Sequence, residues 1–481
     1  MKKQFVYCLL LLLLFADLIF SFMQHYSMPL DGDMVDGIIP NGDVSQILND
    51  PFGISVITNN AVYSNPNRFF AHWTFFTYFN YVPIWLQNFT NPIESVYLAC
   101  AIAKILIQVS IMTLLALYIT GKRKFFDGEF LIVSILITPL FQINGYRSNM
   151  GIIDPSITYT FFYALPCALL LLFYLPFFSD SVNHTQLLSK KRIKLLLFSL
   201  GIIIVFNGAL NTGVILIITL LFVLNCFFKM SINLSFDKKT FQAFLITTKT
   251  HLFIFIFVSI FSLYALYIGK NNAIFLGKTI SIGERYSRIP IGINTVITQN
   301  IGYQMLIVFI SINLIILFRY YNDSETKKTL RLFGWIGLFV IIYILLLPLG
   351  GYKEYRPNIL RYDTIMPVTI AFIFIYTKSS YQLLKYLKGK FKMIYLILLI
   401  IFSYKFTIAD KPEINNNNHE KLALEKISKS NEKVVFIEDN CTILSWEKIT
   451  DPRKSTSIGQ LLKRWKITSD NKEFYQNKNI N

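Results

Sequence analysis

Charged residues are scarce in this chain of 481 residues, and that scarcity argues against a soluble fold. Asp, Glu, Lys and Arg make up 15% of the sequence, hydrophobic residues make up 54%, and the mean hydropathy is +0.48. Water-soluble domains carry about a quarter charged residues, so most of this chain must face lipid. The composition therefore predicts a protein that crosses a membrane many times.

Several catalytic motifs are also missing. The sequence has no Walker A loop, no Gly-x-Ser-x-Gly and no His-Glu-x-x-His, which argues against an ATP-driven pump or a membrane metalloprotease. The five histidines show no metal-ligand spacing, and the five cysteines give no disulfide framework. Most of the cysteines lie in or beside apolar segments, which is typical of residues that pack as small hydrophobes.

The net charge of +18 does not indicate a nucleic-acid partner. The cations lie in short clusters between apolar runs, as they do in polytopic proteins that follow the positive-inside rule. With the N-terminus in the cytoplasm, the predicted inside segments carry 22 Lys and Arg, whereas the longer outside loops carry 9. This asymmetry predicts a cytoplasmic N-terminus.

Apolar runs long enough to cross a hydrocarbon core of about 30 Å mark the predicted spans. Because no small-x-small cleavage site follows the first run, we predict an uncleaved signal anchor there, with a cleaved signal peptide as the alternative. The almost continuous run 195–228 is interrupted by turn formers and is interpreted as two short crossings or as a re-entrant hairpin. The eleven predicted spans are 5–23, 95–119, 129–143, 156–178, 195–207, 213–228, 251–268, 300–318, 332–349, 364–377 and 393–409.

The last part of the chain, residues 410–481, is less hydrophobic and of mixed charge. Residues 434–437 have the pattern of a short buried strand, and residues 458–465 that of an amphipathic helix. After eleven spans this tail emerges outside. We therefore predict an all-α multi-span domain, 1–409, followed by a small soluble extracytoplasmic appendage of the α/β or α+β class, 410–481.

The first outside loop, 24–94, is the most informative segment. Between residues 24 and 93 it holds five aspartates and a single cation, although the chain as a whole is strongly basic. Asp31, Asp33 and Asp36 follow directly on the first span. Whether this stretch is helical or extended, two of its carboxylates share a face, which raises the pKa of one and suits it to accept a proton. The alternative is that these residues simply form turns and helix caps.

Further polar residues on the same side of the membrane are candidates for substrate binding. Arg68 and His72 lie among aromatic residues that predict a structured surface within the first loop. Arginine grips phosphate oxygens through its planar fork, so cations in outside loops suit a lipid phosphate. The alternatives are snorkelling and a structural Arg361–Asp363 pair. The candidate cations in the later loops are Arg285, Arg288, Lys353, Arg356 and Arg361.

This organisation resembles the GT-C superfamily of integral-membrane glycosyltransferases. The resemblance lies in the first span, the long first outer loop that opens with aspartates, the number of spans and the outside C-terminal domain. It implies transfer of a sugar from a polyprenyl-phosphate donor to an extracytoplasmic glycan, lipid or protein acceptor. Here the acidic residues are spaced as Asp-Gly-Asp, whereas adjacent acidic pairs are common in the superfamily.

The resemblance also implies roles for individual residues. A first-loop carboxylate, Asp31 or Asp33 with Asp36 as a third candidate, would act as the base or bind a divalent cation such as Mg or Mn. Arg356 and Arg361 would hold the lipid phosphate. We expect such a protein in the inner membrane of a bacterium, acting in cell-envelope polysaccharide biosynthesis.

A flippase for lipid-linked oligosaccharides and an O-antigen-type polymerase are the rival interpretations. A flippase should place cations along the inside of its spans, where only Lys104 qualifies. Polymerases usually carry a large loop late in the chain, whereas the longest loop here is the first. Both observations favour the transferase.

Overall fold

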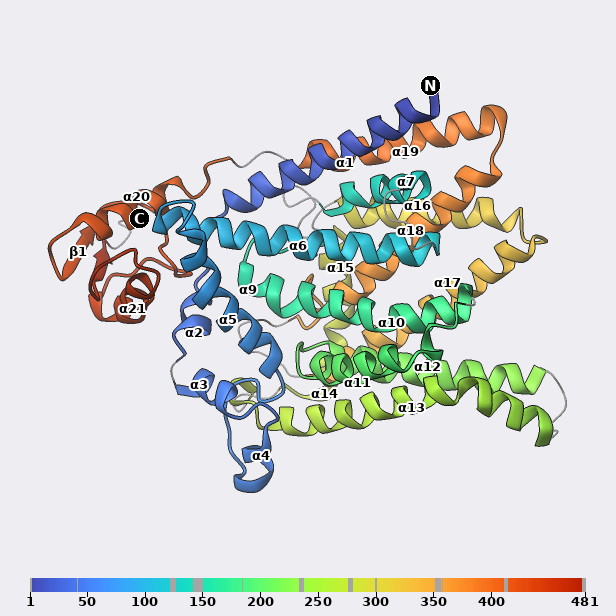
Figure 1. Ribbon diagram of the computed structural model, residues 1–481, viewed down its shortest axis with the longest axis horizontal. Coiled ribbons are helices and arrows are strands. Elements are labelled where there is room, and N and C mark those ends of the chain that lie inside the picture. Colours follow the sequence, from blue (N-terminus) through green and yellow to red (C-terminus); the bar gives the residue numbers. More distant parts are fainter. Residues whose placement is uncertain are drawn as a thin grey trace.

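The computed structural model describes residues 2–40, 42–121, 127–141, 150–183, 185–232, 238–275, 280–298, 301–350, 356, 358–410 and 414–477. Among them, eight helical segments are long and apolar enough to cross a membrane, which identifies a multi-pass membrane protein. These segments run side by side in Figure 1. They are formed by α1 (Lys2–Tyr26), α6 (Pro92–Thr120), α9 to α10 (Ile157–Asn183), α12 (Asn211–Ile232), α13 (Lys238–Ile268), α16 (Ile301–Phe318), α17 (Ser324–Leu346) and α19 (Gly389–Ala409).

Within the described residues, each of the eleven apolar runs predicted from the sequence overlaps a helix. The three runs outside that set of eight lie on α7 (Gly128–Ile137), which is short and continues as η1 (Thr138–Phe141), on α11 (Lys191–Val205), and on α18 (Met366–Tyr386). Residues 206–210 separate α11 from α12, so the run 195–228 forms two helices. The turn formers in that run therefore predicted its interruption correctly.

Helix α6 shows how local sequence sets the ends of a span. Asn91 caps its N-terminus by accepting a hydrogen bond from the backbone N–H of Glu94, and Pro92 occupies the first helical position. Gly121 ends the helix in the left-handed conformation. The 29 residues between these signals extend about 43 Å at 1.5 Å per residue, more than the hydrocarbon core requires.

The first loop is folded into short helices and one long one. The short helices are α2 (Met34–Ile38), α3 (Gly42–Asn49) and α4 (Ile54–Asn59), and the long one is α5 (Phe69–Leu86). Phe75 and Phe79 of α5 are completely buried. The sequence predicted a structured surface here but not an 18-residue helix.

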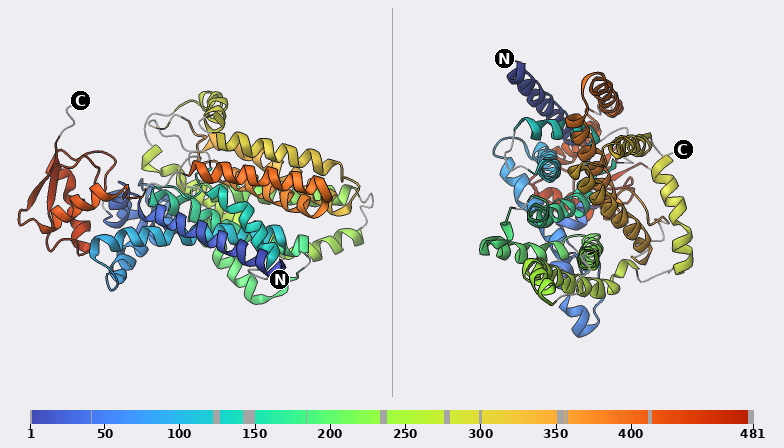
Figure 2. Two further views of the ribbon diagram at one scale, coloured as in Figure 1. Left: turned by 90° about the horizontal axis from the view of Figure 1, so that it is seen from above. Right: turned by 90° about the vertical axis from the view of Figure 1, so that its right-hand side faces the viewer.

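The C-terminal segment forms α20 (Asn418–Lys429), β1 (Val434–Ile437), η7 (Pro452–Ser455), α21 (Thr456–Arg464) and β2 (Glu473–Gln476). The two strands pair in parallel, with Val434 opposite Glu473. The predicted strand and amphipathic helix are both confirmed. Figure 2 shows that this segment lies beyond one end of the helix bundle.

The C-terminal segment packs tightly on the first loop. Trp465 is completely buried, and its indole N–H donates to the carbonyl of Phe79 at 2.9 Å. Arg464 donates to the carbonyl of Ile38 at 3.0 Å and to the side chain of Asn80 at 2.7 Å. Apolar residues of both parts belong to one buried cluster. The C-terminal segment and the first loop therefore form a single structural unit.

A buried carboxyl group, that of Glu420 in α20, sits at this junction. It accepts hydrogen bonds from the backbone N–H groups of Leu30 (2.9 Å) and Leu444 (3.1 Å) and from the hydroxyl of Tyr97 (2.8 Å). Burial raises the pKa of Glu420 to about 7, although these hydrogen bonds oppose the shift. The charge of nearby Asp31 also raises it.

This pKa predicts that docking of the C-terminal segment depends on pH. Because the pKa of Glu420 is higher in the folded state, the protonated carboxyl group stabilises the fold. This stabilisation is complete below about pH 4.5 and is lost as the pH rises through about 7. The loss amounts to roughly 3 kcal/mol at 1.36 kcal/mol per pKa unit. Amide hydrogen exchange in residues 418–476 should therefore be measured in the wild type and in a Glu420→Gln variant at about pH 5 and about pH 8. The ratio of the wild-type exchange rate to that of the variant should be lower at about pH 5 than at about pH 8. The same pH dependence in both proteins would contradict this role.

Candidate functional site

A cavity of about 1120 Å³ lies where the first loop, the C-terminal segment and the ends of several membrane helices meet. Its wall combines stretches that are far apart in the sequence. The predicted outside loops thus supply side chains to one site. Among the described residues, the charged groups that line it are four carboxylates and three guanidinium groups, those of Asp33, Asp36, Asp154, Asp363, Arg68, Arg356 and Arg361.

Asp31 does not line this cavity; its carboxylate holds the first loop in place through hydrogen bonds. Its Oδ2 accepts from the hydroxyl of Ser156 (2.8 Å) and the backbone N–H of Thr158 (3.0 Å). Its Oδ1 accepts from the hydroxyl of Thr158 (2.8 Å) and the backbone N–H of Asp33 (3.0 Å). Burial raises the pKa of Asp31 against these hydrogen bonds. Both oxygens are thus used to fasten the first loop to the start of α9 (Ile157–Tyr159).

Asp33 and Asp36 line the cavity from either end of the first turn of α2. The carboxylate of Asp33 has one hydrogen bond among the described residues, from the indole N–H of Trp446 at 2.9 Å. Partial burial raises the pKa of Asp36, and repulsion from Asp33 adds to the effect. The raised pKa makes the Asp36 carboxylate a stronger proton acceptor, which suits this pair of carboxylates to proton transfer.

Asp154 adds a carboxylate from a different loop. Its Oδ1 accepts from the backbone N–H of Ser156 at 2.8 Å, and burial raises the pKa of Asp154. Lys104 of α6 is buried nearby and donates to the carbonyl of Pro155. This intramembrane lysine therefore supports the loop that carries Asp154.

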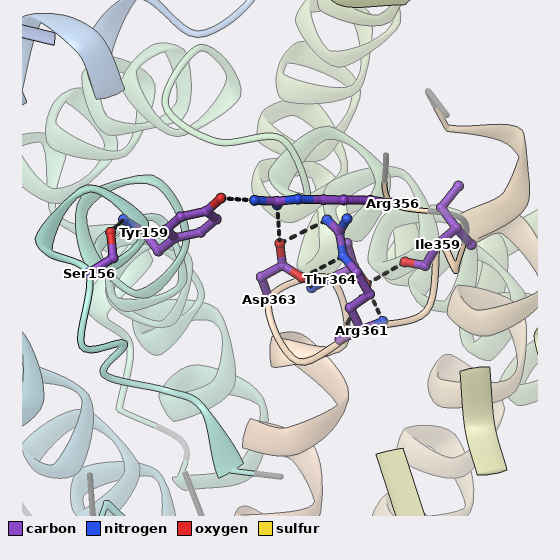
Figure 3. Close-up of polar contacts among 7 residues, drawn as sticks. All are labelled: Ser156, Tyr159, Arg356, Ile359, Arg361, Asp363 and Thr364. Atoms are coloured by element: carbon purple, nitrogen blue, oxygen red, sulfur yellow. Dashed lines mark hydrogen bonds and ion pairs between the residues drawn. The ribbon is translucent and has the colours of Figure 1, made fainter. Parts of the chain in front are cut away.

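Arg356 and Arg361 face a common partner, Asp363 (Figure 3). Arg361 forms two hydrogen bonds with this carboxylate, from Nε (3.1 Å) and from Nη2 (2.9 Å), which is the structural pair considered from the sequence. Arg356 lies 3.8 Å from the same carboxylate and donates to the hydroxyl of Tyr159, and its guanidinium carbon lies 5.2 Å from the centre of the Tyr159 ring. Both arginines also line the cavity, so pairing positions them without removing them from it.

Arg68 and His72 line the cavity from the start of α5. The Nε of Arg68 and both ring nitrogens of His72 are buried and have no hydrogen-bond partner among the described residues. Burial lowers the pKa of His72 to about 3, and the charge of Arg68 acts in the same direction. A neutral imidazole therefore faces the cavity with hydrogen-bonding capacity to spare, which is unusual for a buried polar group.

The other predicted cations do not line the cavity in the described part of the chain. Arg285 donates to the carbonyls of Ile280, Pro348 and Gly350, and Arg288 forms an ion pair with Glu284 at 2.6 Å. Lys353 lies outside the described residues. No group of three His, Cys, Asp or Glu side chains is placed to hold a metal ion within the described ranges.

The sequence assigned no role to three residues that line the cavity, namely Asp154, Tyr159 and Trp446. Asp154 carried a weak signal, because it lies in an outside loop next to a proline. Tyr159 is an ordinary aromatic residue near the start of a span. Trp446 carried none, since it lies 413 positions from its partner Asp33.

Comparison with known proteins adds no assignment to this cavity. No family model matches the chain, and no curated protein matches it. The function must therefore follow from the geometry and chemistry of the cavity.

Proposed function

We propose that this protein is an integral-membrane glycosyltransferase of the GT-C type, which transfers a sugar from a polyprenyl-phosphate donor to an extracytoplasmic glycan, lipid or protein acceptor. One observation supports this proposal above all. First-loop carboxylates and later-loop arginines, which are remote in sequence, line the same cavity at the end of a helix bundle. A lipid-linked sugar phosphate needs both kinds of group at the membrane surface.

The cavity suggests a division of labour. Asp33 takes the proton from the acceptor hydroxyl, and Asp36 and Asp154 complete the acidic wall. The acceptor oxygen attacks the anomeric carbon, and the bond from that carbon to the phosphate oxygen breaks. The electron pair leaves with the polyprenyl phosphate. Arg356 and Arg361 stabilise the charge that develops on this leaving group.

Arg68 and His72 complete the polar surface. The Nε of Arg68 donates to a phosphate or sugar oxygen, and the neutral ring of His72 both accepts from and donates to sugar hydroxyls. Contacts of this kind supply the partners that these buried nitrogens lack among the described residues.

The proposed topology has eleven spans, with a cytoplasmic N-terminus and the cavity and C-terminal segment on the extracytoplasmic side of a bacterial inner membrane. Single cysteines at Ser45, Ser287 and Ser457 in a cysteine-free background should react with a membrane-impermeant thiol reagent in intact or outer-membrane-permeabilised cells. A cysteine at Ser324 should stay unlabelled until the inner membrane is opened. Labelling at Ser324 together with no labelling at Ser457 would overturn the eleven-span model.

The function is tested by mass spectrometry of surface glycans. Cells that lack the gene should lose a glycan or glycolipid, and the wild-type gene should restore it. A double variant, Asp33→Asn with Asp36→Asn, should fail to restore it although the protein reaches the membrane. Asp470→Asn is the matched control, because this carboxylate is exposed and lies outside the cavity. Full restoration by the double variant would contradict the transferase and favour a flippase or polymerase.

A further inference from the structure

The C-terminal segment places one large aromatic side chain at the cavity. The side chain of Trp446 is 60% exposed, yet it lines the cavity beside the carboxylates of α2. Its indole N–H donates to Oδ1 of Asp33 at 2.9 Å, which fixes the edge of the ring. An apolar ring is thus held in the open next to acidic groups.

The backbone around Trp446 is held in place at two points. Gly32 lies so close that a Cβ atom there would sit 2.7 Å from the backbone nitrogen of Trp446, so only glycine allows this approach. Leu444 is buried with a positive φ of 47°, a conformation that strains a branched side chain. Its N–H donates to the buried Glu420 at 3.1 Å. Such backbone strain clusters at functional sites.

An exposed indole beside carboxylates matches the two-sided chemistry of a sugar ring. One face of a pyranose is a sheet of C–H groups that packs on an aromatic surface, whereas its hydroxyl groups donate to carboxylates. We propose that Trp446 is the platform on which the sugar ring of the substrate stacks, with its hydroxyl groups turned toward Asp33 and Asp36. This inference rests on the proposed function in that it assigns a sugar to the same cavity.

Its position at the cavity distinguishes Trp446 from another exposed tryptophan of the chain. Trp85 in α5 is also 60% exposed, but it contacts Phe89 and does not line the cavity. Trp85 is therefore a matched control, since it offers the same side chain with the same exposure and no acidic neighbours in the cavity.

Binding is tested without any transfer reaction. The purified full-length protein is titrated with a panel of methyl hexopyranosides and methyl N-acetylhexosaminides while its tryptophan fluorescence is followed. At least one glycoside should give a saturable change that persists in Trp85→Phe and disappears in Trp446→Phe. No saturable change in the wild type, or the same change in Trp446→Phe, would overturn the platform.

Transfer kinetics then separate stacking from simple support of Asp33. Removing the ring in Trp446→Ala should raise KM about tenfold or more, whereas Trp446→Phe, which keeps an aromatic face but no N–H, should stay within about threefold. An equal fall in kcat in both variants with KM unchanged would show that only the N–H matters and would refute the platform. If Asp33→Asn transfers normally while Trp446→Ala raises KM, the platform stands and the catalytic assignment of Asp33 fails.

Discussion

Asp33→Asn should lower the transfer rate by roughly 10²–10⁴-fold, the usual contribution of a general base. The amide cannot take a proton from the acceptor, but its oxygen still accepts the hydrogen bond from Trp446. The side chain is only half-buried, so expression should not change. Single-turnover transfer with purified protein measures the effect directly.

Asp31→Asn is the matched control, because the same substitution two residues away should act on folding. Each oxygen of Asp31 accepts one backbone N–H, from Thr158 or from Asp33. In either orientation of the side-chain amide in Asp31→Asn, its NH₂ group therefore faces a backbone N–H, so two hydrogen-bond donors oppose each other. Such a buried conflict costs about 1–3 kcal/mol of stability. We expect a lower unfolding temperature for Asp31→Asn and an unchanged one for Asp33→Asn.

Two results would contradict this division. Transfer within a few-fold of wild type in Asp33→Asn, Asp36→Asn and Asp154→Asn would show that the acidic wall does no chemistry. Loss of transfer in Asp31→Asn with unchanged stability would move the catalytic role to that residue. Either result can be distinguished from misfolding, because stability and turnover are measured on the same preparations.

Arg356→Lys and Arg361→Lys should each weaken donor binding although they keep the charge. A lysine ammonium group cannot form the two parallel contacts that a guanidinium makes with phosphate. Losing one charge-assisted contact costs about 1.5–3 kcal/mol, or roughly a 10- to 150-fold rise in the donor KM. Titrating the donor at saturating acceptor concentration measures this rise.

The control for the arginines is Arg288→Lys. Arg288 is paired with Glu284 at 2.6 Å and does not line the cavity, so its replacement should leave the donor KM unchanged. Wild-type affinity for the donor in both Arg356→Lys and Arg361→Lys would contradict a role in phosphate binding. It would show that these arginines act only as structural partners of Asp363.

Much of the fold could be predicted because its signals are local. Most of the apolar runs approached the length needed to cross a bilayer, and local signals such as Asn91 and Gly121 mark where a helix begins and where it ends. The strand at 434–437 and the helix after it also followed from short-range periodicity. The long helix α5 was missed because the first loop was interpreted as a surface.

The candidate cavity could be predicted only in outline. The sequence by itself determined that this is a membrane protein of many helices, with acidic and basic loops suited to a shared site. Only the tertiary structure decided that Asp31 is an anchor, that Asp33 and Asp36 face the cavity, and that Trp446 joins them. The physical reason is that a carboxylate's role depends on which donors reach it. For Asp31 and Asp33 those donors come from 125 and 413 residues away, where no local pattern in the sequence can locate them.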